Sequence, residues 1–193
     1  MVAAAARLPA IAADLARLLP DVRAEIIDGE IVEKAEASPL HANAQGTVVG
    51  RLHGPYHRRA GGGPPGGWWI LPEVEVELGA HQVYRPDIAG WRRDRIPELP
   101  RQRPMTIKPD WVCEVISPSN ASNDLVRKLR IYHQSHVDHY WIVDPQNETL
   151  TVLRWTPDGY LTALTAGRAD RVRAEPFVEV ELPVGALFGD EGD

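Results

Sequence analysis

The chain has 193 residues, a length that suits one domain better than two. Hydrophobic residues make up 44 % and charged residues 25 % of the chain, and these ordinary globular values exclude a disordered protein. No apolar run approaches the roughly 18–20 residues that cross a bilayer, so we expect no membrane protein. A single cysteine, Cys113, cannot form an internal disulfide, which favours a cytoplasmic setting.

The net charge of −6 is unevenly distributed along the chain. Residues 175–193 carry six acids and no lysine or arginine, so the rest of the chain is neutral overall. Between Arg85 and Lys108, seven lysines and arginines accompany only three acids. Such a basic segment can attract an anionic polymer, and the alternative is a loop that arginines merely keep in solution.

The N-terminal third predicts a hairpin between two helices. Asp28-Gly29 between β-branched runs is a strong signal for a two-residue hairpin turn. Ser38-Pro39 has the pattern of a helix N-cap followed by the first helical residue. The expected elements are a helix over 9–19, the hairpin over 24–34, a helix from 39 towards 52 or 59, and a loop over 61–67.

The rest of the chain is mostly β. Valine, valine and leucine alternate with glutamates over 73–78, which is typical of a half-buried antiparallel strand. We expect strands over 68–78, 83–91, 111–116, 140–143, 149–155, 160–164 and 177–182, and a helix over 123–135. The pattern predicts a single α+β domain over residues 1–193, with a mixed, mostly antiparallel central sheet flanked by helices.

Two carboxylates fall inside or at the end of these strands. Glu114 lies in a run whose other members are Trp, Val, Cys, Val and Ile, and Asp87 follows Pro86 at a second strand. An unpaired buried charge costs several kcal/mol, so Glu114 must be neutralised, paired or bound to a cation. The plainer alternative for Glu114 is a place at the edge of the sheet, paired with an arginine or facing water.

Carboxylates from neighbouring strands suit Mg²⁺, which takes few protein ligands and keeps several waters. Such an ion can activate water and stabilise charge on a phosphodiester. Lys128, on the following helix, can then place a positive charge near the reacting phosphate. The alternative for Lys128 is a surface ion pair with Asp124, four residues earlier.

These residues belong to an ordered series of motifs that covers roughly residues 24–188. The series resembles the Uma family of proposed restriction endonucleases, within the PD-(D/E)XK nuclease superfamily. The motifs that carry the resemblance are Glu25-Ile26-Ile27-Asp28-Gly29-Glu30, Ser38-Pro39-Leu40-His41, Tyr84-Arg85-Pro86-Asp87-Ile88, Pro109-Asp110-Trp111-Val112-Cys113-Glu114-Val115-Ile116-Ser117-Pro118-Ser119, Asn123-Asp124-Leu125-Val126-Arg127-Lys128, and Val137-Asp138-His139-Tyr140-Trp141-Ile142-Val143-Asp144-Pro145.

The resemblance implies a restriction endonuclease-like fold with a divalent-metal site on adjacent strands. By position, Asp87 and Glu114 match the acidic residues of the motif and, with the backbone carbonyl of Val115, would bind Mg²⁺, with Mn²⁺ as a possible substitute. Asp110 also follows a proline, but it would enter the same strand as Glu114, so Asp87 is preferred. Ile116 stands where the superfamily usually has lysine, and the resemblance makes Lys128 the substitute.

The resulting hypothesis is a metal-dependent endonuclease that hydrolyses phosphodiester bonds of DNA. The alternative is a catalytically silent module that binds nucleic acid or protein. Ile116 and the negative net charge favour this alternative, whereas the presence of Asp87, Glu114 and Lys128 favours the enzyme. DNA and a second copy of the chain are the expected partners, and no organic cofactor is expected. Candidate accessory residues are Glu25, His41 and Asp124, and candidate DNA contacts are Arg85, Arg92 and Arg93.

Overall fold

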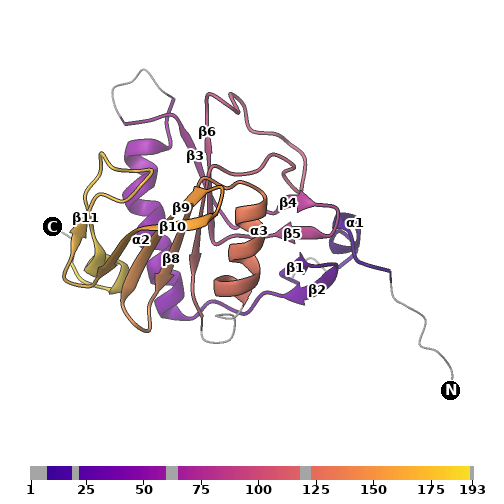
Figure 1. Cartoon of the computed structure of the whole chain (residues 1–193), viewed down its shortest axis with the longest axis horizontal. Helices are drawn as coiled ribbons and strands as arrows, with labels where there is room; N and C mark the ends of the chain where they lie inside the picture. The colour runs from indigo at the N-terminus through magenta and orange to yellow at the C-terminus, as the bar shows by residue number, and fades with distance from the viewer. Residues whose placement is uncertain (1–7, 19–21, 60–64, 118–122, 192–193) are drawn as a thin grey trace.

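The computed structural model describes residues 8–18, 22–59, 65–117 and 123–191 (Figure 1). Its elements in chain order are α1 (Ala12–Leu15), β1 (Ala24–Ile27), β2 (Glu30–Glu33), α2 (Pro39–Tyr56), β3 (Trp68–Pro72), β4 (Val76–Gly79), β5 (Gln82–Tyr84), β6 (Ile88–Arg92), β7 (Trp111–Val115), the π-helical segment η1 (Asn123–Lys128), α3 (Leu129–Gln134), β8 (His139–Asp144), β9 (Thr149–Thr156), β10 (Gly159–Gly167), β11 (Arg171–Val172), β12 (Leu182–Pro183) and the 3₁₀ segment η2 (Val184–Phe188). No helix in these ranges is both long and apolar enough to cross a membrane.

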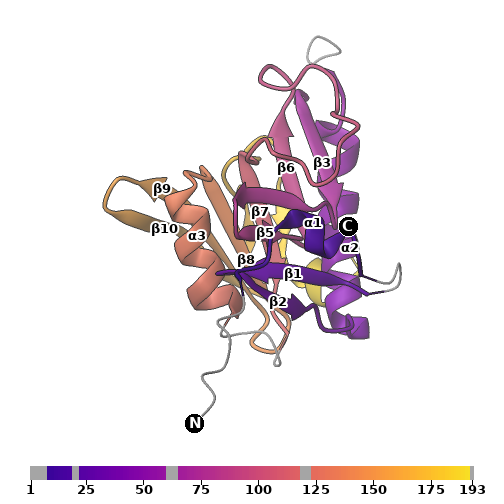
Figure 2. The same cartoon turned by 90° about the vertical axis from the view of Figure 1, so that its right-hand side faces the viewer.

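The main sheet has six strands in the order β10-β9-β8-β7-β6-β3. Only β7 and β8 pair in parallel, and the chain between them carries η1 and α3. The other four neighbouring pairs are antiparallel. The α2 and α3 helices lie on opposite sides of this sheet (Figure 2). The predicted α+β class with a mixed, mostly antiparallel sheet between helices is therefore confirmed.

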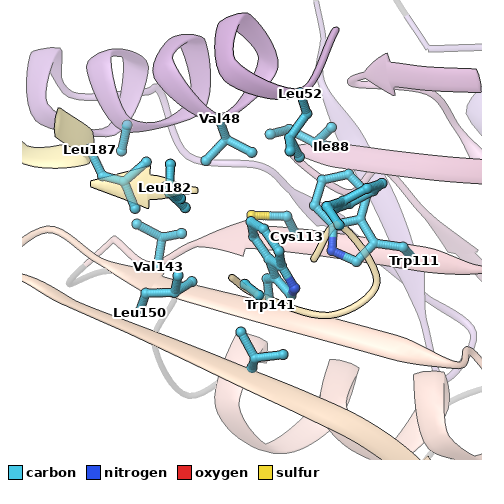
Figure 3. Close-up of a cluster of buried hydrophobic side chains, with 14 of the residues drawn as sticks. Val48, Leu52, Ile88, Trp111, Cys113, Trp141, Val143, Leu150, Leu182 and Leu187 are labelled. Carbon is cyan, nitrogen blue, oxygen red and sulfur yellow. The ribbon is translucent and has the colours of Figure 1, made fainter. Parts of the chain in front are cut away.

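A hydrophobic core fills each face of the sheet. On the α2 side, Val48 and Leu52 pack with Cys113 and Val143 from the central strands (Figure 3). On the other side, Tyr132 of α3 packs against residues of β1, β5, β7 and β8. Because successive side chains of a strand point to opposite faces, Glu114 lies on the α3 side when Cys113 faces α2.

A second sheet, in the order β2-β1-β5-β4, lies beside α3 (Figure 1). Its β1–β2 hairpin pairs Ile27 with Glu30, and the two turn residues Asp28 and Gly29 have φ values of 53° and 80°. A two-residue hairpin turn whose twist matches that of its strands requires left-handed backbone conformations at both turn residues. The predicted hairpin is confirmed, and so is the helix that Ser38 caps by accepting a hydrogen bond from the His41 amide.

Several element predictions need correction. The strand expected over 68–78 is two strands in different sheets, because the chain turns at Glu73 (φ 57°) between β3 and β4. Alternation continues across the break since each half is itself half-buried, so periodicity alone cannot reveal it. The strand expected over 83–91 is likewise divided into β5 and β6, which belong to different sheets, and Asp87 comes just before β6. The helix expected over 9–19 spans only Ala12–Leu15, and the strand expected over 177–182 is a series of turns before β12.

Candidate active site

Asp87 and Glu114 meet at one end of the β6–β7 pair. Ile88 of β6 pairs with Cys113 of β7, which brings the residues beside them, Asp87 and Glu114, to the same part of the sheet. Both side chains are buried, with 1 % of each residue exposed. They line a cleft of about 10 Å³ whose other polar members are Lys34, Glu36, His41, Ser117 and Lys128.

The Asp87 carboxylate is held on both oxygens. Its Oδ1 lies 2.7 Å from the Lys34 ammonium and 3.3 Å from His41 Nε2. Its Oδ2 accepts a 2.7 Å hydrogen bond from the Val115 amide. Burial opposes ionisation, but the hydrogen bond from His41 and the charge of Lys34 prevail and hold the pKa of Asp87 well below its usual range. Asp87 is therefore an anion at neutral pH.

Glu114 has partners from the helical segment on its side of the sheet. The Tyr132 hydroxyl donates to Oε1 at 2.6 Å, and Lys128 Nζ lies 3.1 Å from the same oxygen. Lys128 and Tyr132 are four residues apart, so a single helical turn presents both to Glu114. Burial and the neighbouring Glu114 raise the pKa of Tyr132 well above its ordinary value, which keeps its proton on the hydroxyl.

Lys128 connects Glu114 to the second sheet. Its ammonium lies 3.2 Å from Glu25 on β1 as well as beside Glu114, and only 3 % of Lys128 is exposed. Glu25 in turn accepts a 2.7 Å hydrogen bond from the Arg85 amide. Among the proposed site residues, Asp87, Glu114, Lys128, Glu25 and His41 thus come together, whereas the side chain of Asp124 lies outside the described part of the structure.

Lys34 is a member of the site that the sequence reasoning missed. Besides Asp87, its ammonium contacts Glu73 at 3.2 Å and the Arg85 carbonyl at 2.8 Å. Burial would lower the pKa of Lys34, but Asp87 and Glu114 outweigh it, so the pKa is raised and the lysine is charged. One signal could have found it: the chain has only three lysines among 21 basic residues, at 34, 108 and 128, and two of them are in this site.

The first turns of α2 complete the surroundings of Asp87. His41 and Gln45 are four residues apart on one face, and Gln45 donates to the Asp87 carbonyl at 2.8 Å. The positive end of this helix dipole therefore lies near the Asp87 anion. His41 Nδ1 is buried without a hydrogen-bond partner among the described residues, so the lining keeps an unsatisfied polar atom.

The three arginines proposed as DNA contacts do not form one surface. Arg85 is close to the site, but its guanidinium pairs with Glu75, which also binds Arg103. Arg92 and Arg93 lie at the opposite end of β6 from Asp87. Asp110, the competing candidate for the metal site, lies at that end of β6. Its carboxylate accepts a hydrogen bond from the Arg92 amide and forms an ion pair with Arg95, so Asp110 has a structural role away from the cleft.

The donors in the cleft fit a hard divalent cation. No group of three or more His, Cys, Asp or Glu side chains in the described ranges is arranged to hold a metal by itself. Asp87 and Glu114 nevertheless bring two carboxylates to one cleft, and Mg²⁺ is often held by one or two carboxylates with waters. Val115 also lines the cleft; its amide binds Asp87, and its carbonyl as a ligand stays a prediction.

Comparison with known proteins identifies the family. The Uma2 family, described as "Putative restriction endonuclease", matches residues 12–185. The chain belongs to this family. A solved structure of a protein from Anabaena variabilis ATCC 29413, described as "a putative nuclease belonging to DUF820", superposes with a TM-score of 0.73 over 93 % of this chain and 98 % of that chain. At 20 % identity, that likeness shows a shared fold. A search of curated proteins gave no significant match.

Proposed function

We propose that this Uma2 protein is a metal-dependent endonuclease that hydrolyses phosphodiester bonds of DNA. The observation that carries the proposal is the pairing of two buried carboxylates, Asp87 and Glu114, with two lysines in one cleft, whose side chains are 8 % (Lys34) and 3 % (Lys128) exposed. Burying four charged groups is costly, and a fold that needed only stability could use apolar residues there. Membership of the family supports the same reaction class.

Asp87 and Glu114, with the Val115 carbonyl, would hold Mg²⁺, and Mn²⁺ could replace it. When bound, the ion supplies a water of lowered pKa and a positive charge for the phosphate oxygens. Lys128 keeps its ammonium beside Glu114 and would orient the attacking water or stabilise the charge that develops on the phosphate. Lys128 would thus take the role of the lysine that the superfamily usually has at the position of Ile116.

Each neighbour has a positioning task in this scheme. Tyr132 fixes Glu114 through a 2.6 Å hydrogen bond, and Glu25 holds the other side of the Lys128 ammonium. The Val115 amide and His41 fix Asp87. Groups held by several partners in this way lose little entropy when substrate binds, which favours catalysis.

A catalytically silent binding module is the second candidate. One observation favours it: Lys34 and the Val115 amide each lie 2.7 Å from a different Asp87 oxygen, so protein groups already satisfy that carboxylate. A silent protein would keep this arrangement whatever metal is added. Metal binding and cleavage therefore distinguish the two candidates.

The test uses Asp87→Asn and Glu114→Gln with plasmid nicking in Mg²⁺ and Mn²⁺. Either substitution removes one ligand charge, so cleavage should be lost and Mn²⁺ affinity should fall. Asp110→Asn is the matched control, because Asp110 is also buried and also follows a proline but lies away from the cleft. Full cleavage by either cleft variant, with the fold checked by circular dichroism, would contradict the site.

We also propose a reducing, cytoplasmic setting. The support is the one cysteine, Cys113, whose thiol is buried and free. Burial raises the pKa of Cys113 well above its usual value, with the nearby Asp87 and Glu114 charges adding to the effect. Such a thiol is unreactive and fits a structural role in the core.

A further inference from the structure

A groove of about 520 Å³ opens at the end of β6 opposite the acidic cleft. Three arginines, Arg59, Arg92 and Arg93, line it together with the start of β3. Its volume lies within the range of small-ligand sites. Arg59 follows α2 and Arg92 ends β6, so the chain brings them together from segments far apart in sequence.

Indole rings position two of these arginines. The Arg93 guanidinium carbon lies 3.3 Å from the centre of the Trp69 ring, and Arg93 Nε donates to the Trp68 carbonyl at 2.8 Å. Arg92 lies over the Trp68 ring at 5.2 Å. Stacking of this kind holds a guanidinium in place while its terminal nitrogens remain able to donate.

In the described part of the chain, the guanidinium groups of these three arginines also have no carboxylate partner. Nine other arginines form ion pairs, among them Arg95, Arg103 and Arg154, whereas within the described residues none is found for the groove arginines. The acids Asp94 and Glu98 share the lining but lie beyond ion-pair distance of them. Burial and the neighbouring charge of Arg59 lower the pKa of Arg93, as expected where like charges face each other.

We propose that this groove binds phosphate groups of a nucleic-acid backbone, at a contact separate from the acidic cleft. Guanidinium groups match phosphate oxygens with paired hydrogen bonds, and an anion would relieve the repulsion between Arg59 and Arg93. The inference rests on the proposed nuclease function for its choice of nucleic acid over free phosphate.

The spacing suits a duplex. Arg92 comes five positions after Asp87, and five steps along an extended chain span roughly 17 Å. This distance is about half of one turn of B-DNA, which repeats every ~34 Å. A duplex held at the groove could therefore present another phosphate near the cleft without a change in the sheet.

The experiment measures binding of a labelled 30-base-pair duplex of mixed sequence in EDTA, where metal-dependent cleavage does not occur. Arg59→Gln combined with Arg92→Gln removes the two exposed groove charges and leaves the stacked Arg93 in place. The control combines Arg154→Gln with Arg171→Gln, two half-exposed arginines on β9 and β11 that change the net charge equally.

The groove variant should bind the duplex about tenfold more weakly, and the slope of log affinity against log salt should shrink by about two. The control should keep most of its affinity. Equal losses in the two variants, or no loss in the groove variant, would overturn the proposal. Inorganic phosphate that binds as tightly as the duplex would overturn the choice of nucleic acid.

The two proposals fail separately. Plasmid nicking by the wild type, together with unchanged duplex binding by the groove variant, would refute the groove and leave the nuclease standing. Duplex binding that depends on the groove, in a protein that binds no Mn²⁺ and cuts no plasmid, would refute the nuclease and leave the groove standing.

Discussion

At the scale of single residues, the choice between lysine and arginine is informative. Lysine carries a compact ammonium that can enter a narrow cleft, whereas the planar guanidinium of arginine is larger and better suited to open surfaces. The cleft contains Lys34 and Lys128, and the groove contains Arg59, Arg92 and Arg93. The two kinds of cation therefore occupy sites of matching size.

Lys34 should compete with a metal for Asp87. Its ammonium lies 2.7 Å from Asp87 Oδ1, one of the two oxygens that could bind a cation. The cleft volume of about 10 Å³ is close to the smallest that holds a single water, so it leaves little room for both the ammonium and a metal ion. Lys34→Met removes this positive charge, so Mn²⁺ affinity, measured by calorimetric titration at pH 7, should rise about tenfold or more.

The same substitution should lower the metal-free stability by about 3 kcal/mol, because the buried Asp87 carboxylate loses its lysine counter-charge and keeps, among the described residues, only His41 and the Val115 amide. Lys108→Met is the matched control, since Lys108 is the one lysine outside the cleft and its ammonium binds the His136 carbonyl. Unchanged or weaker Mn²⁺ affinity in Lys34→Met would show that Lys34 does not oppose metal binding.

At the scale of elements, local signals predicted what depends on neighbours in sequence. The Asp28-Gly29 turn and the Ser38 cap each fix their element through contacts a few residues away. The break at Glu73 and the place of Lys34 depend on partners far along the chain, such as Asp87, 53 residues after Lys34. Spacing could suggest that Asp87 and Glu114 meet, but not which lysine would reach each of them.

Glu75 connects the chain before β4 to two distant segments and should make stability depend on pH. Glu75 is buried, and burial disfavours its charged form. Hydrogen bonds from Arg103 and Arg85 nevertheless lower the pKa of Glu75 below the ordinary value. A lowered folded-state pKa gives stability that is present above the unfolded value of about 4.3 and is lost as the pH falls through the folded value.

Glu75→Gln should therefore destabilise the protein by about 1–2 kcal/mol at pH 7, a modest amount because Arg103 is 74 % exposed and screened by water. Urea unfolding at a series of pH values from 7 to 3 measures the difference from wild type. The difference should shrink towards the acid end. A difference that stays constant or grows as the pH falls would contradict the assignment.

At the scale of the whole molecule, the central strands join the two cores. Residues of β7 and β8 contribute to both clusters, Trp111 and Cys113 on the α2 side and Val112 and Tyr140 on the α3 side. Separating the cores would divide a continuous six-stranded sheet. For this reason we propose that the chain folds as a single domain.

The proposed catalytic cleft of one chain can cut one strand at a time. We expect a symmetric dimer, because closed twofold dimers are the commonest assemblies and two clefts would cut both strands of a duplex in one encounter. Light scattering at micromolar concentration should give twice the 21.4 kDa of a single chain.

At that concentration supercoiled plasmid should become linear with little open circle, whereas dilution to monomers should let open circles accumulate. A monomeric mass at micromolar concentration would contradict the dimer, and linear product formed at the same rate by monomers would show that pairing of clefts is not needed.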